Sequence, residues 1–174
     1  MRTRFWIIIT LLTISLFGNI ETFAQTGPQR LFSHADEEGT MYFINAKKLS
    51  NLENIKGFEF DITYLDYTDS ATINFTIISS NPSDVSALKV GNGQTEVTAT
   101  DVELLYHEMK GKNYVVRTTS KVPYLALKEM MTAQSPLVFN VTRADGQRDM
   151  ATYKPSQWKK ERDLFERIIF LINK

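Results

Sequence analysis

The feature that most constrains this chain is a pair of alternating segments between Phe58 and Ile78. Every second residue in each segment is apolar, and the residues between them are mostly polar. The apolar positions are Phe58, Phe60, Ile62 and Tyr64 in the first segment and Ala71, Ile73, Phe75 and Ile77 in the second. Successive side chains of a strand point to opposite faces, so this period of two predicts two half-buried strands. Turn-forming residues occupy 66–69, and we therefore expect a β-hairpin.

The same alternation predicts the register of the hairpin. If Leu65 and Ser70 flank a four-residue loop, Phe60 lies opposite Phe75, and every apolar residue faces another apolar residue. A shift by one residue would pair the buried face of one strand with the wet face of the other. Two strands alone are marginally stable in water, so another part of the chain must cover this apolar face.

The N-terminus has the features of a secretory signal peptide. Arg2 and Arg4 precede an apolar run over residues 5–17, and Thr22 and Ala24 stand at the −3 and −1 positions of a cut before Gln25. The alternative is an uncleaved anchor, but this run of 13 residues is shorter than the roughly 20 that a spanning helix needs. We predict a signal peptide over 1–24 and an exported protein, periplasmic or extracellular, that is not an integral membrane protein after cleavage.

Charge and cysteine content exclude several classes of function. The predicted cleavage removes Arg2, Arg4 and Glu21, which leaves 18 basic and 19 acidic residues and a net charge of −1. A chain so close to neutral has no electrostatic footprint for nucleic acid, so we expect no nucleic-acid partner. It also has no cysteine, which excludes disulfides, thiol chemistry and cysteine-based zinc sites. The export signal without cysteine resembles exported proteins of Gram-negative bacteria, and suggests the bacterial envelope.

About 150 residues remain after the predicted cut, a length that suits one domain. Residues 25–40 are polar and predict a loose N-terminal lead-in to a single β-rich domain over 41–174. Residues 41–44 are apolar and are expected in a strand. Apolar residues at a spacing of three predict a turn or two of helix over 46–55.

Three further hairpins and two helices are expected downstream. The predicted strand pairs are 85–90 with 95–100, at an edge of the sheet, 102–107 with 114–119, and 137–142 with 150–153. Proline at a helix start predicts a short helix near 123–133. An amphipathic C-terminal helix, capped by Ser156, is expected from Gln157 to Ile172 and should cover the first hairpin.

The predicted fold is therefore α+β. It is a curved antiparallel sheet of about six to eight strands, a half-open barrel or a sandwich, with the short helix and the C-terminal helix packed on it.

Few residues suggest a functional site. The chain contains only two histidines and no motif for catalysis, nucleotide binding or metal binding, so we predict no catalytic residue, cofactor or metal. Asp66, Tyr67 and Asp69 at the hairpin tip form the candidate surface contact. Their carboxylates could hold calcium and the tyrosine could contact sugar or protein, the alternative being an ordinary acidic turn.

Other side chains offer weaker signals. Glu59 and Asp61 share the wet face of the hairpin and could act as the paired carboxylates of a glycosidase. Asn74 and Asn140 begin N-glycosylation sequons. Ser70 lies in an Asp-Ser-Ala motif similar to one used for O-glycosylation in some exported bacterial proteins.

Three functions remain open. The leading hypothesis is a non-enzymatic exported domain that binds a partner, namely an envelope protein, a glycan or a lipid. The second is a small hydrolase that uses carboxylates or His107. The third is a carrier that holds a hydrophobic ligand in a cavity between sheet and helix.

Overall fold

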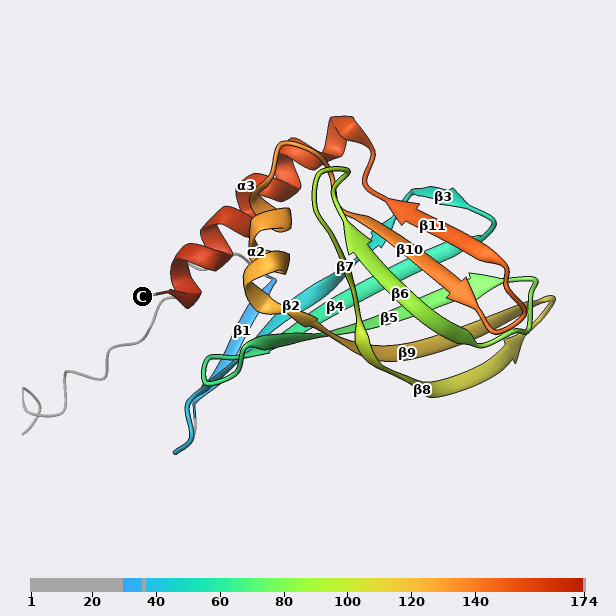
Figure 1. Ribbon diagram of the computed structural model, residues 1–174, viewed down its shortest axis with the longest axis horizontal. Helices are drawn as coiled ribbons and strands as arrows, with labels where there is room; N and C mark the ends of the chain where they lie inside the picture. Colours follow the sequence, from blue (N-terminus) through green and yellow to red (C-terminus); the bar gives the residue numbers. More distant parts are fainter. Residues whose placement is uncertain (1–29, 36, 174) are drawn as a thin grey trace, which may run out of the picture.

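The computed structural model describes residues 30–35 and 37–173. The predicted signal peptide and its cleavage site lie outside these residues. The described chain forms eleven strands in two antiparallel sheets, with two helices against them (Figure 1). The predicted α+β class is confirmed, although these strands outnumber the six to eight expected.

The first sheet has six strands in the order β1-β2-β4-β5-β9-β8. They are β1 (Leu31–Ala35), β2 (Thr40–Leu49), β4 (Gly57–Leu65), β5 (Ser70–Ser79), β9 (Asn113–Pro123) and β8 (Thr100–Lys110). Its centre is the predicted hairpin β4–β5, in which Phe60 lies opposite Phe75 and Tyr64 opposite Ala71. The predicted register is therefore confirmed, and the alternation on both strands excludes a shift by one residue.

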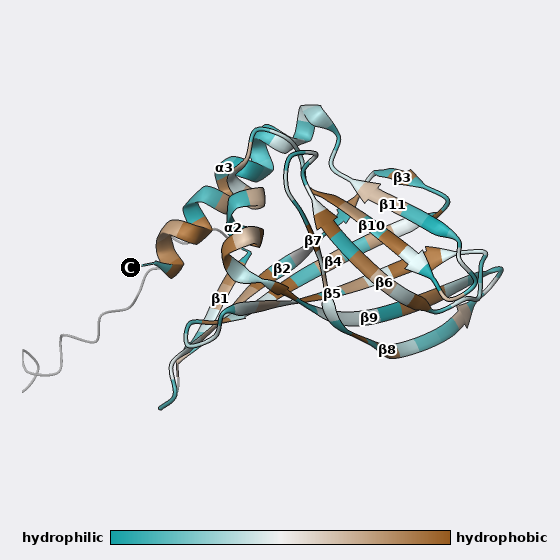
Figure 2. Cartoon of the chain, viewed as in Figure 1, coloured by the Kyte–Doolittle hydropathy of each residue, from teal (hydrophilic) through white to brown (hydrophobic). Residues whose placement is uncertain are grey.

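The second sheet has five strands in the order β3-β11-β10-β6-β7. They are β3 (Asn51–Glu53), β11 (Arg148–Thr152), β10 (Val138–Arg143), β6 (Val85–Gly91) and β7 (Glu96–Thr98). The three downstream hairpins are all present, as β6–β7, β8–β9 and β10–β11. Strand β7 lies at the edge of its sheet, as expected. Figure 2 shows hydrophobic and hydrophilic residues alternating along β6 and β10.

Two N-terminal expectations are wrong. Residues 46–55 form no helix, because Leu49 ends β2 in the first sheet and Leu52 belongs to β3 in the second. Ser50 connects the two strands, so the spacing of three between the two leucines spans two sheets and does not mark a helix. In the segment expected as a loose lead-in, Leu31–Ala35 form β1 and pair with β2.

The two sheets are joined at both sides by chain that passes from one to the other. The two shortest of these connections are single residues, Ser50 between β2 and β3 and Ala99 between β7 and β8. The arrangement is the sandwich form of the prediction, with its apolar faces turned inward.

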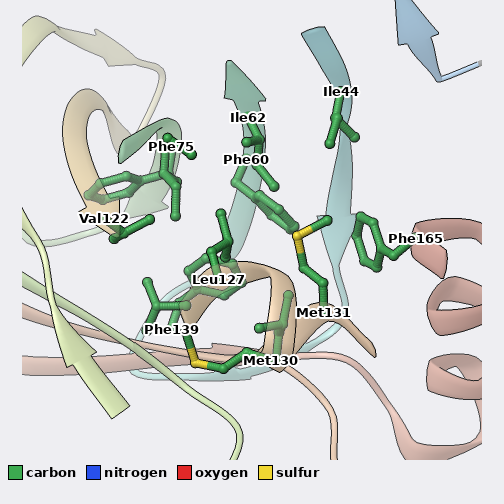
Figure 3. Close-up of a cluster of buried hydrophobic side chains, with 14 of the residues drawn as sticks. Ile44, Phe60, Ile62, Phe75, Val122, Leu127, Met130, Met131, Phe139 and Phe165 are labelled. Carbon is green, nitrogen blue, oxygen red and sulfur yellow. The ribbon is translucent and has the colours of Figure 1, made fainter. Parts of the chain in front are cut away.

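Large aromatic side chains fill the space between the sheets. The ring of Phe139 on β10 lies 4.6 Å from Phe60 and 5.1 Å from Phe58, and Phe58 lies 5.7 Å from Phe75. Buried residues of the helix α2 (Tyr124–Thr132) complete this core (Figure 3). Tilted and offset aromatic pairs at such distances add about 0.5–1.5 kcal/mol each beyond the area that they bury.

The C-terminal helix α3 (Pro155–Ile172) packs on the sheet, as predicted, and lies beside α2. Figure 3 shows Phe165 close to Ile44 of β2 and Met131 of α2. The expectation that α3 covers the Phe60–Phe75 pair needs correction, because Phe139 of the second sheet contacts Phe60 there. In the described part of the chain, neither helix is both long enough and apolar enough to cross a membrane.

The start of α3 also differs from the prediction. Ser156 is not the N-cap, because the helix begins at Pro155 and Lys154 occupies the capping position without a side-chain bond. Proline lacks an N–H that would need a partner, and its fixed φ suits the first helical position.

Buried tyrosines lie at the helix-covered end of the sandwich. The ring of Tyr124 stacks on Tyr64 with 3.6 Å between centroids. Burial raises the pKa of Tyr124 to about 12, and the charge of nearby phenols adds to this effect. Burial also raises the pKa of Tyr153 to about 12, although Arg30 acts in the opposite direction. The folded protein therefore favours the neutral phenols.

We expect the protein to lose stability as the pH rises from about 10 to about 12. Below this window both phenols are neutral in the folded and unfolded chains, whereas within it the unfolded chain releases protons that the folded chain retains. The loss should reach about 1–3 kcal/mol for each tyrosine. Urea unfolding at several pH values measures it, and the variant Tyr124→Phe/Tyr153→Phe should lose less stability over the same window. An equal loss of stability in that variant would show that the two tyrosines do not cause the effect.

Candidate functional site

The candidate contact at the hairpin tip is built largely from groups that hold the fold together. The Asp66 carboxylate accepts a hydrogen bond from the Thr40 N–H at 3.0 Å, and the Asp66 N–H donates to the Thr40 carbonyl at 3.1 Å. The Asp69 carbonyl accepts from the Tyr124 N–H at 2.8 Å. Tyr67 is 51 % exposed. Both aspartates thus link the tip to β2 and α2, and a role of the tip in binding stays a prediction.

Among the groups considered for hydrolysis, Glu59 and Asp61 lie two residues apart on β4, but His107 does not converge with them. Asp61 lies on the outer face of β4, where Arg117 donates to it at 2.6 Å and Asn74 at 2.8 Å. His107 lies on β8, with its Nδ1 2.9 Å from the Asp84 carboxylate. Strands β4 and β8 are three positions apart in the sheet, which corresponds to about 14 Å. Among the described residues, no three His, Asp or Glu side chains gather as a metal site would require.

A pocket of about 450 Å³ opens on the outer face of the second sheet. The strand register builds it, because residues opposite each other on neighbouring strands share a face. Asn140 of β10 pairs with Met150 of β11 and with Lys89 of β6. Met150 pairs in turn with Glu53 of β3, and Lys89 with Thr98 of β7. One row of outward side chains therefore crosses all five strands.

A second, shorter row lies beside the first, with Arg148 of β11 opposite Thr142 of β10. Met150 is two residues from Arg148 along β11, so Glu53, which faces Met150, is the diagonal neighbour of Arg148. Such diagonal neighbours are about 7–8 Å apart. Arg148, Thr142, Met150 and Glu53 all line the pocket.

Several polar groups in the pocket already have partners within the protein. Lys89 Nζ lies 2.8 Å from the Glu96 carboxylate, which also accepts from Asn140 Nδ2 at 3.3 Å. The hydrogen bond from Lys89 is the main cause that lowers the pKa of Glu96. In contrast, the Glu53 carboxylate and the Arg148 guanidinium have no side-chain partner among the described residues. Within the described part of the chain, the pocket therefore offers one unpaired carboxylate and one unpaired guanidinium.

A buried ion pair supports this pocket from inside the sandwich. Arg143 Nε lies 2.6 Å from the Asp149 carboxylate, and both side chains are fully buried. Arg143 also donates to the Ser83 carbonyl at 2.8 Å, and Gln147 donates to Asp149 at 2.6 Å. Because Asp149 stands between Arg148 and Met150, these bonds fix the strand that carries part of the pocket lining.

A second buried charge, on α3, anchors the helix. Glu161 is 3 % exposed and is bound by Arg30 at 2.7 Å and by Lys47. Burial is the main cause that lowers the pKa of Lys47, followed by the charges of Arg30 and Lys160. The cluster ties α3 to the beginning of β1 and to β2, and we assign it a structural role.

Comparisons of the chain with family models, with curated proteins and with solved structures find no match. The assignment of a site therefore depends on the geometry of this chain alone. Sequence reasoning did not single out Glu53, Lys89, Arg148 or Met150, because their shared face follows from long-range strand pairing. Asn140 was noted only as a sequon residue, and here its side chain lies in the pocket.

Proposed function

We propose that this chain is an exported, non-enzymatic binding domain, and that its outer pocket on the second sheet binds a short peptide with a free ammonium and a free carboxylate. The observation that carries the proposal is that Glu53 and Arg148, on diagonal positions of one pocket, have no side-chain partner in the residues that the structure describes. Export is supported by the basic and apolar N-terminal sequence.

The chemistry of the two groups is complementary to the two ends of such a ligand. A guanidinium binds a carboxylate through two parallel hydrogen bonds, and a carboxylate accepts hydrogen bonds from an ammonium. Asn140 and Thr142 supply an amide and a hydroxyl for the peptide main chain. Met150 lies on the strand between the two charges and offers an adaptable apolar contact. A ligand with one charge of each sign would pair both free groups at once.

Two features favour surface binding over the alternatives of hydrolase and hydrophobic carrier. His107 lies three strands away from Asp61, and both side chains already have partners. The interior between the sheets is occupied by fully or almost fully buried aromatic rings, including Phe60 and Phe139.

The test is calorimetric titration of the purified protein with the dipeptide Ala-Ala. We expect Glu53→Gln and Arg148→Gln each to weaken binding by roughly 10- to 100-fold, because hydrogen bonds to charged groups contribute about 1.5–3 kcal/mol. N-acetylation of the peptide should abolish the effect of Glu53→Gln, and C-terminal amidation the effect of Arg148→Gln. Glu129→Gln, an exposed change on α2, is the matched control and should bind like the parent protein.

Two results would overturn the proposal. One is equal binding of Ala-Ala and of its doubly capped form, which would show that the charges do not contribute. The other is the absence of binding at millimolar peptide.

A further inference from the structure

On the other sheet, the strand β2 contains a bulge that opens a separate pocket. Ile44 pairs with Ile62 and Lys47 pairs with Phe60, so Asn45 and Ala46 together face the single residue Asp61. A bulge of this kind interrupts the ladder and re-aims the neighbouring side chains. A pocket of about 320 Å³ lies at this point on the outer face, lined by Phe43, Ile44, Asn45, Glu59, Asp61 and Ile62.

One wall of this pocket is aromatic. Phe43 points to the outer face of β2 and is 37 % exposed. Its cross-strand partner on β1 is Phe32, which is 47 % exposed. Two phenylalanines side by side on a water-facing surface leave apolar area that a ligand could remove from water.

The opposite wall consists of hydrogen-bonding groups. The Glu59 carboxylate has no partner among the described residues. Asp61 accepts one hydrogen bond on each oxygen, from Asn74 and from Arg117. Since an ionised carboxylate has about four acceptor positions, Asp61 retains capacity for a ligand.

These groups are held in place before any ligand arrives. Arg117 donates to Thr76 at 3.0 Å as well as to Asp61, which fixes the carboxylate on the sheet. The Asn45 carbonyl accepts two bonds from Arg30, at 3.1 and 2.8 Å, so the bulge is clamped while its amide side chain stays exposed. Groups that are already ordered lose less conformational freedom on binding.

We infer that this pocket binds a neutral saccharide. A pyranose ring has an apolar C–H face that can lie on Phe43 and hydroxyls that can donate to Glu59 and Asp61. The Asn45 amide can both donate to and accept from such hydroxyls. Two carboxylates in the lining oppose the binding of acidic sugars by like-charge repulsion. The site shares no residue with the pocket on the second sheet and stands independently of the peptide proposal.

The experiment is titration of the purified protein with cellohexaose, maltohexaose and, as an acidic arm, hexagalacturonic acid. At least one neutral hexaose should bind. Phe43→Ala should weaken its binding by about tenfold or more, which corresponds to about 1.4 kcal/mol. Phe43→Tyr keeps an aromatic ring and should retain most of the affinity, and Glu59→Gln should weaken binding several-fold.

Two controls keep the test decisive. Leu125→Ala changes an exposed apolar residue of α2 and should leave saccharide binding unchanged. If Phe43→Ala does not fold, Phe32→Ala tests the aromatic neighbour of Phe43 and Glu59→Gln tests the polar wall of the pocket. Failure of all the saccharides to bind, tighter binding of the acidic arm than of the neutral ones, or no effect of the aromatic substitution would each overturn the inference.

Discussion

Replacing Asp149 by alanine is expected to destabilise the protein by about 3–5 kcal/mol. The side chains of Asp149 and Arg143 are fully buried, with 2.6 Å between Nε and Oδ2. Without the carboxylate, the guanidinium remains inside the protein, and its hydrogen bonds to the described residues go to neutral groups, the Ser83 carbonyl and the Ser79 hydroxyl. These bonds satisfy individual N–H groups but do not compensate for the desolvation of the charge.

Two matched variants separate charge from packing in this result. The double replacement Arg143→Met/Asp149→Leu removes both charges and should cost clearly less than Asp149→Ala alone. Glu108→Ala removes a carboxylate from the exposed pair with Lys110 and should cost no more than about 1 kcal/mol. Urea unfolding of the three variants measures these differences. If Asp149→Ala is no more damaging than Glu108→Ala, the buried pair does not have the assigned role.

The parts of the fold that could be predicted from the sequence are those set by local patterns. The register of β4 with β5 follows from two alternating segments and a short turn, and no distant residue is needed to fix it. The hairpin β10–β11 follows in the same way from an Asp-Gly turn at Asp145 and Gly146. Such turns join neighbours in the chain, so they leave the order of the hairpins within the sheets open.

Pairing between strands that are distant in the sequence explains most of the wrong predictions of the fold. Strand β10 pairs with β6 as well as with β11, and β3 pairs with β11, although nothing in the local patterns of these strands indicates their partners. The short strand β3 itself was expected as helix because of the spacing of three between Leu49 and Leu52. That expectation failed because the two leucines belong to different sheets. The cover of Phe60 was assigned to α3 for the same reason, because an amphipathic helix is a visible candidate and Phe139 on a distant strand is not.

The candidate sites were harder to foresee than the fold. Glu53, Asn140 and Arg148 become neighbours only when three strands of the second sheet align. The bulge that opens the pocket beside Phe43 has no sequence signature of the usual kind, because neither Asn45 nor Ala46 is glycine or proline. Charged residues are normally exposed, so the sequence gives no sign that Arg143 and Glu161 are buried.

Replacing Phe139 by alanine is expected to destabilise the protein by about 3–5 kcal/mol. Phe139 is fully buried, and its ring lies 4.6 Å from Phe60 and 5.1 Å from Phe58. Truncation would leave a cavity between the sheets and remove both aromatic contacts, and backbone pairing of β10 with β6 and β11 limits how far the strand can move to close it. Urea unfolding measures the loss, and Leu125→Ala, which removes a 70 % exposed side chain, should change stability by no more than about 0.5 kcal/mol.

The same substitution tests which element covers the central hairpin. If the second sheet is the cover, Phe139→Ala should reduce the free energy of unfolding while α3 stays docked, since Phe165 and Glu161 hold this helix at β2 through separate contacts. Hydrogen exchange should then show faster exchange in β4 and β5 than in α3. A loss below about 1 kcal/mol, or a loss of protection confined to α3, would mean that the rings of the two sheets do not support each other, and the assignment of the core would be wrong.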